Sequence, residues 1–139
     1  MSNMQLDTLR RIVQEINASV SLHDSLDIMV NHVAEAMHVD VCSIYLLDER
    51  NKRYVLMASK GLKPEAVGHV SLNVGEGLVG LVGKREEIVN LDNAPKHERF
   101  AYLPETGEEL FNSFLGVPVM YRRKVMGVLV VQNQEPQDF

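Results

Sequence analysis

The chain has few of the residues on which several protein classes depend. Among its 139 residues there is one cysteine, Cys42, and no tryptophan, and aromatic residues make up 6%. A disulfide framework is excluded because Cys42 has no intramolecular partner. No apolar run approaches the ~18 residues of a membrane span, and the start MSNMQLDTLRR lacks the apolar stretch of a signal peptide. A soluble, cytoplasmic protein is therefore expected.

Positive charge is also scarce. The sequence has 14 Lys and Arg against 19 Asp and Glu, a net charge of −5. This balance argues against a general binder of nucleic acid or of anionic membranes. The length corresponds to one domain, and 45% hydrophobic residues can supply a core without disulfides or metals.

The first 38 residues have the period of amphipathic helices. Apolar residues recur at steps of three and four from Leu6 to Val20, which predicts one helix. Ser21 and Asp24 match a capping box, and a second apolar stripe runs from Leu26 to Met37. Two consecutive helices are therefore predicted, the second ending near His38.

From residue 40 the pattern changes to that of strands. Residues 40–60 read as a hairpin with a polar turn at 48–52, and its first strand is apolar on both faces, so both faces should be covered. One cover would be the N-terminal helices, and the other must come from later in the chain. Further strands are predicted at 70–74 and 88–92, a short helix at 76–85, and a second hairpin at 113–132. The resulting order predicts an α+β fold with a mainly antiparallel sheet.

The motif Gly75-Glu-Gly77-Leu-Val-Gly80 matches the G-x-G-x-x-G fingerprint of dinucleotide-binding proteins. The strand before it alternates in polarity and the helix after it is short, which argues against that use. The favoured interpretation is a tight strand-to-helix turn that packs closely on the sheet. In a third interpretation, the N–H groups at the start of the helix bind a small anionic or carbonyl ligand.

Other polar groups have simpler interpretations. His32, Glu35 and His38 favour a solvated helix face over a metal site, and Cys42 favours a buried apolar role. The three cations at 122–124 are most simply a solvated hairpin tip, although they could dock on an acidic partner. No catalytic constellation is recognisable, so the chain itself is not expected to be an enzyme.

The long polar segment 93–112 is the best functional candidate on composition. It combines charge, aromatic faces and an amide, a mixture suited to a small polar ligand. The relevant side chains are Asn93, His97, Arg99, Phe100, Tyr102 and Glu105. A surface loop without function is the alternative.

Taken together, these segments resemble a GAF domain over essentially the whole chain. The resemblance rests on the two leading helices, DVCSIYLLDERNKRYVLMASKGL at 40–62, VSLNVGEGLVGLVGKREEIVNLDNAP at 70–95 and SFLGVPVMYRRKVMGVLVVQNQ at 113–134. Within the superfamily, HERFAYLPETGEELFNSFLGVP at 97–118 is most similar to the N-terminal regulatory domains of phosphoenolpyruvate-protein phosphotransferases of the nitrogen phosphotransferase system.

The resemblance implies a GAF-like (profilin-like) six-stranded antiparallel sheet. N-terminal helices would lie on one face and a ligand pocket on the other, closed by the short helix and the long loop. It also implies a single sensory domain over 1–139, an N-terminal fragment of a longer phosphotransferase. No cofactor is implied for this domain, and Mg²⁺ is expected only for the phosphotransferase domain that 139 residues cannot contain.

The implied ligand is a nitrogen-status metabolite such as glutamine. The cyclic-nucleotide motif of some relatives is incomplete here, and relatives that depend on cysteines need more than Cys42. The anion partner would be the helix start or Arg99, the ammonium partner Asp92, and the amide partner Asn93 or Ser113. The predicted ligand-binding residues are Gly77, Leu78, Val79, Gly80, Asp92, Asn93, His97, Arg99, Phe100 and Ser113.

An alternative hypothesis needs no ligand. The apolar stripe of the first helix could be shared between the sheet and a two-fold partner helix, which predicts a homodimer. The domain would then be a dimerisation and signal-transmission module.

Overall fold

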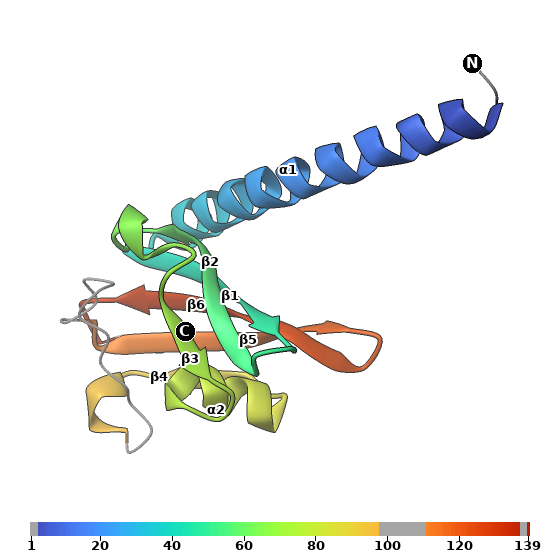
Figure 1. Ribbon diagram of the computed structural model, residues 1–139. Coiled ribbons are helices and arrows are strands. Elements are labelled where there is room, and N and C mark those ends of the chain that lie inside the picture. Colours follow the sequence, from blue (N-terminus) through green and yellow to red (C-terminus); the bar gives the residue numbers. More distant parts are fainter. Residues whose placement is uncertain (1–2, 98–110, 137–138) are drawn as a thin grey trace.

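A six-stranded antiparallel sheet separates two helices in the computed structural model (Figure 1), with the strand order β3-β2-β1-β6-β5-β4. The model describes residues 3–97, 111–136 and 139, and at residues 3, 4 and 14–21 it describes the backbone only. The elements are α1 Asn3–Met37, β1 Val41–Asp48, β2 Arg53–Lys60, the 3-10 turn η1 Pro64–Ala66, β3 Ser71–Asn73, α2 Gly77–Arg85, β4 Val89–Leu91, the 3-10 turn η2 Ala94–Lys96, β5 Ser113–Tyr121 and β6 Lys124–Asn133. The predicted α+β architecture is confirmed.

Helix α1 is continuous over 35 residues, so the prediction of two helices is wrong. The predicted boundary rested on Ser21 as a cap, but a cap ends a helix only where the preceding residues leave the helical conformation. No glycine or proline interrupts residues 3–37, and nothing local forces such a departure. At about 1.5 Å per residue the helix is about 52 Å long, and its N-terminal half projects beyond the sheet (Figure 1).

The C-terminal end of α1 lies where it was predicted. His38 has a left-handed backbone with φ of 54°. The Val39 N–H donates to the Ala34 carbonyl at 3.1 Å, which closes the last turn in a Schellman arrangement. The chain then enters β1 directly, so that the helix folds back over β1 and β2.

Strand β1 is covered on both faces, as its apolar pattern predicts. Cys42 and Ile44 pack with Val30 of α1, whereas Val41 and Tyr45 belong to the cluster formed with α2. The helices therefore cover opposite faces of the sheet, α1 over β1 and β2 and α2 over the other face (Figure 1). We refer to these as the α1 face and the α2 face.

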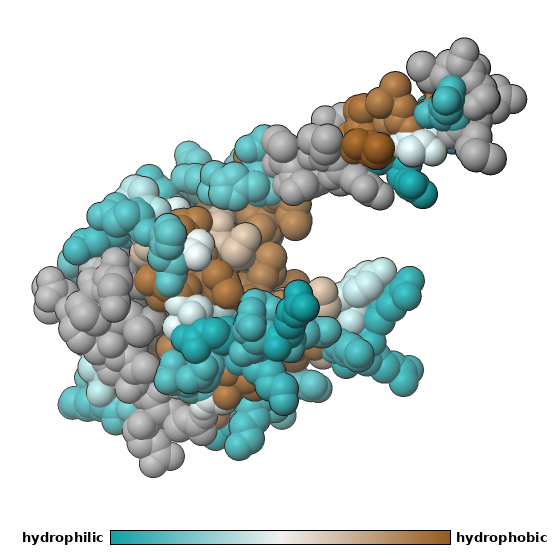
Figure 2. Space-filling model, viewed as in Figure 1, coloured by the Kyte–Doolittle hydropathy of each residue, from teal (hydrophilic) through white to brown (hydrophobic). Residues whose placement is uncertain are grey.

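The two halves of α1 differ in burial. Leu26, Val30 and Ala34 are buried against the sheet. In the projecting half, Leu6 and Leu9 are 44% and 50% exposed, and apolar side chains there remain uncovered in the space-filling view (Figure 2). Among the described residues no helix has both the length and the apolar character needed to cross a membrane.

Candidate functional site

The glycine motif forms a tight turn from β3 into α2. Gly75 and Gly77 have positive φ values of 87° and 65°. A Cβ on Gly80 would lie 2.6 Å from the carbonyl carbon of Gly75, so only glycine permits this approach. The turn-and-packing interpretation is confirmed. The dinucleotide interpretation is wrong because α2 joins β3 and β4, the two edge strands of an antiparallel sheet, where the fingerprint requires a parallel βαβ unit.

The start of α2 is buried against the sheet. Gly77, Leu78, Val79 and Gly80 all lie in its first turns and are buried. The Gly80 N–H donates to the Glu76 carbonyl at 3.0 Å, within the helix. The N–H groups that lack an intrahelical partner are therefore those before Gly80.

The two ends of segment 93–112 are brought together beside β5. The Ala94 N–H donates to the Asn112 carbonyl at 2.6 Å, and Leu91 pairs with Phe114. Asp92, immediately after β4, is exposed. Asn93 precedes η2, is half-buried, and its side chain does not cap the turn.

The remaining predicted site residues lie in different environments. His97 is half-buried at the end of η2. The Ser113 hydroxyl donates to the Asn133 carbonyl at 3.2 Å and accepts the Asn133 N–H at 3.1 Å, so it joins β5 to β6. Strand alternation also places it on the α1 face, away from α2. The predictions for Arg99, Phe100, Tyr102 and Glu105 lie outside the described residues.

Three polar residues on the α2 face were not among the site residues predicted from the sequence: Ser43, Ser59 and Gln132. Ser43 of β1 is completely buried, and its hydroxyl lies 2.9 Å from that of Ser59 on β2. Gln132 of β6 is 6% exposed and pairs with Phe114 of β5. The signal was available: each is a polar residue at an inward position of a strand whose other inward residues are apolar.

The α2 face also carries a perturbed tyrosine. The Tyr54 hydroxyl lies where a side chain on Gly83 of α2 would be, so the phenol is packed under the helix. Burial raises the pKa of Tyr54, and the nearby charge of Glu86 raises it further. The group therefore stays neutral and can offer its hydroxyl as a hydrogen-bond donor at physiological pH.

Cys42 has a different environment. It is completely buried on the α1 face, and this burial raises the pKa of its thiol to about 11. Because the thiolate is the reactive form, the predicted apolar role of Cys42 is confirmed and a nucleophilic role is disfavoured.

The helical histidines form a solvated face, as predicted. His32, Glu35 and His38 are exposed. Within residues 3–97, 111–136 and 139, no group of three or more His, Cys, Asp or Glu side chains is placed to hold a metal ion. A hollow of about 330 Å³ near the end of α1 contains none of the predicted site residues; it is lined by Asn31, Ala34, Glu35, Val39 and Lys60.

An antiparallel six-stranded sheet with a helix on each face is the architecture of a known domain family. The GAF domain family matches residues 21–139, and the chain belongs to it. The match to the family model begins inside α1, whereas the similarity to the solved domain reported next extends over the whole chain.

Within the family the chain is similar to domains of one class of enzyme. It is 80% identical to the GAF domain from an Acinetobacter phosphoenolpyruvate-protein phosphotransferase, over 100% of this chain and 82% of that one, with a TM-score of 0.77. The corresponding Coxiella burnetii domain is 43% identical over 99% and 83% of the two chains, with a TM-score of 0.82.

One relative is much longer than this chain. A protein of Escherichia coli (strain K12) described as "Phosphoenolpyruvate-dependent phosphotransferase system" is 44% identical over 86% of this chain. The chain spans 16% of the length of that relative.

Proposed function

We propose that this chain is the small-molecule-sensing regulatory domain of a phosphoenolpyruvate-protein phosphotransferase of the nitrogen phosphotransferase system. The observation that carries the proposal is the 80% identity, over the whole chain, to the GAF domain of such an enzyme. The enzymatic chemistry would belong to another part of the polypeptide. The E. coli relative supports this division, because the similarity covers only 16% of its length.

The proposed ligand is a nitrogen-status metabolite such as glutamine, bound on the α2 face. That face carries buried polar side chains, Ser43 and Gln132, whereas most of its other residues are apolar. A mostly apolar pocket with few polar groups is typical of small-molecule sites. The predicted residues Asp92, Asn93 and His97 follow β4 at the same end of the sheet as the start of β5.

Regulation would work through differential binding. A ligand held between α2 and the sheet, and also by both ends of segment 93–112, favours the conformation in which those parts are together. The ligand shifts the activity of the attached enzyme by as much as it distinguishes the two conformations.

Thermal unfolding of the 139-residue chain tests the ligand. Glutamine at ten times its Kd should stabilise the fold by about 1.4 kcal/mol, a rise of a few degrees in Tm. Asn93→Ala should abolish the rise, and Asn31→Ala is the matched control because Asn31 is exposed on α1. An unchanged Tm at millimolar glutamine would contradict the glutamine proposal, and a rise with 2-oxoglutarate or a cyclic nucleotide alone would replace it.

A second candidate function is dimerisation and signal transmission, which the exposed stripe of α1 favours. Leu6, Leu9 and Val13 lie about a quarter turn around the helix from the buried stripe of Leu26 and Val30. The projecting half therefore presents its own apolar face, at the 3-4 spacing of a coiled coil. A second copy of α1 would cover it.

Sedimentation tests this alternative. Leu9→Glu should convert a dimer to a monomer, because it places a charge in the shared stripe. Leu22→Glu is the matched control, since Leu22 is 55% exposed on the same helix but lies off the stripe. A wild-type chain that sediments as a monomer at high concentration would contradict the dimer.

A further inference from the structure

The β5–β6 hairpin extends beyond the strands on both sides of it. The pairing of β1 with β6 stops at Leu46 and Gly127, and the pairing of β4 with β5 stops at Val89 and Gly116. Residues 118–126 therefore form a two-stranded ribbon in which each strand has only the other as a neighbour (Figure 1). We call these residues the basic ribbon.

The turn of the basic ribbon is strained. Arg122 and Arg123, between the paired residues Tyr121 and Lys124, have φ values of 50° and 66°. A two-residue turn with two positive φ values strongly favours asparagine and glycine. Two arginines are unfavourable here for folding alone, which points to a use for their charges.

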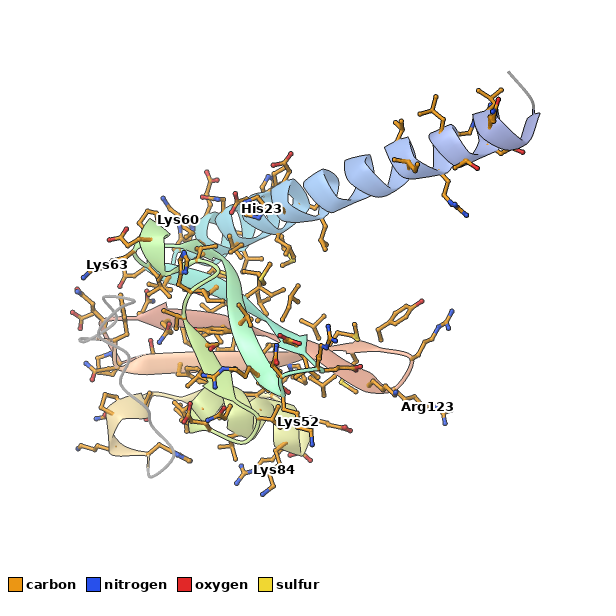
Figure 3. The ribbon with its side chains drawn as sticks, viewed as in Figure 1. His23, Lys52, Lys60, Lys63, Lys84 and Arg123 are labelled. Carbon is orange, nitrogen blue, oxygen red and sulfur yellow. The ribbon has the colours of Figure 1, made fainter. Side chains whose placement is uncertain are left out.

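The charges of the basic ribbon have no partner in the described chain. Residues 113–134 contain no aspartate or glutamate. Among the residues described, Arg122, Arg123 and Lys124 form no ion pair; Arg122 lies 5.2 Å from the centroid of the Tyr121 ring. Figure 3 shows Arg123 at the outer end of the hairpin, away from the sheet.

Apolar side chains accompany these cations. Met120, Tyr121 and Met126 are 42%, 59% and 41% exposed. Exposed methionine, tyrosine and arginine are residues that protein interfaces favour. The combination fits a protein surface that is acidic with an apolar centre.

We propose that the basic ribbon docks this domain onto an acidic surface of the phosphotransferase part of its own polypeptide. The identity of that partner rests on the proposed function. A ribbon tip is too small for a stable interface between separate proteins, but a linked partner has a high effective concentration and needs little contact area. Anionic lipid recognition usually uses about four to eight clustered cations, and the net charge of −5 disfavours polyanions.

Zero-length carbodiimide cross-linking of the full-length phosphotransferase polypeptide tests the proposal. Lys124 should form amide links to Asp or Glu outside residues 1–139, at least about tenfold more than Lys60 or Lys63, and high salt should reduce them. Lys60 and Lys63 are exposed controls on another part of the surface (Figure 3). Equal labelling of the three lysines would overturn the proposal.

A turn variant separates docking from folding. Arg122→Asn with Arg123→Gly removes both charges while supplying the residues that the turn prefers. The variant should unfold at a higher temperature and yet lose most Lys124 cross-links. A double variant Lys60→Glu with Lys63→Glu should keep them. Retained cross-links in the turn variant would overturn the proposal.

Other partners would give other outcomes. Lys124 links between two copies, or sedimentation with vesicles containing about 30% anionic lipid that the turn variant loses, would each overturn the proposal. The cross-linking readout needs no glutamine. Loss of glutamine stabilisation with intact cross-links would contradict the ligand proposal alone, and the reverse result would contradict docking alone.

Discussion

The two faces of the sheet differ in the apolar cluster that each one buries: among the described residues, the buried cluster on the α2 face is larger than the one on the α1 face. The α1 face packs Cys42, Ile44 and Ala58 under a long helix. The α2 face buries Ser43 and Gln132 among its apolar residues, and the helix on that face has nine residues and begins with close-packed glycines. The α1 face buries two polar residues as well, Ser113 and Asn133, which bond to each other across β5 and β6.

Buried polar groups on either face need hydrogen-bond partners, because an unbonded buried polar group costs free energy. The Ser43 hydroxyl lies 2.9 Å from that of Ser59 on the α2 face, and the Ser113 hydroxyl bonds to the Asn133 backbone on the α1 face. The proposed ligand lies on the α2 face, so substitutions on the α1 face should change stability alone. Substitutions on the α2 face should change the response to a ligand as well.

The largest effect is expected for Ile44→Ala on the α1 face. Ile44 is 2% exposed, and a truncated buried isoleucine typically costs about 2–5 kcal/mol in the free energy of unfolding. Urea unfolding measures this loss. The stabilisation by glutamine should be unchanged, and its disappearance in a variant that remains folded would contradict the separation of the two faces.

Gly80→Ala should come next. In an exposed helix this substitution stabilises by about 1 kcal/mol, but here the added Cβ meets the Gly75 backbone, so we expect a loss of about 1–3 kcal/mol. Gly68→Ala is the control, because a Cβ there has no neighbour within 4 Å and suffers only from its φ of 82°. A more stable Gly80→Ala variant would show that the close approach is not required.

The neighbours Cys42 and Ser43 allow a matched comparison of the faces. Both are completely buried, they point to opposite faces, and each loses one heavy atom on substitution by alanine. Each variant should lose about 1 kcal/mol. Only Ser43→Ala should weaken glutamine stabilisation, measured by thermal shift; equal weakening in Cys42→Ala would break the comparison.

The last comparison concerns alkaline pH. The pKa of Cys42 is about 11 in the folded chain against 9.0 for an unperturbed thiol, so the folded state holds this proton more tightly. The corresponding stability is present below pH 9 and is lost as the pH rises from about 9 to about 11. As the pH rises over this range, the urea midpoint of the wild type should fall more steeply than that of Cys42→Ala. Comparing the two proteins also corrects for Tyr54, because its raised pKa is common to both. Parallel curves would contradict burial of the thiol.

Much of the fold was predictable because its signals are local. The two hairpins were placed within a few residues, since alternation and the polar turns at 48–52 and 122–124 lie within each hairpin. The helix break at Ser21 was wrong because a cap motif is permissive: it ends a helix only if the preceding chain leaves the helical conformation. The end at His38 was right because the chain must turn there to reach β1.

The candidate site was predicted only in part. The glycine turn was interpretable because its requirement for positive φ is local. Ser113 was a plausible ligand residue in sequence, but its hydroxyl is used by Asn133 across the β5–β6 pair. Alternation marks Ser43 and Gln132 as inward-facing, but which helix covers that face and which partner bonds Ser43 depend on strands far apart in the chain.

The sequence alone determined the strands, the short helix, the α+β class and the family, because periodicity, turn residues and family motifs are properties of neighbouring residues. Tertiary structure decided which polar groups face α2, that α1 projects its first half beyond the sheet, and that the basic ribbon stands clear of its neighbours. These features depend on where strand pairing stops and on which face a helix covers. Both are set by contacts between residues far apart in the chain.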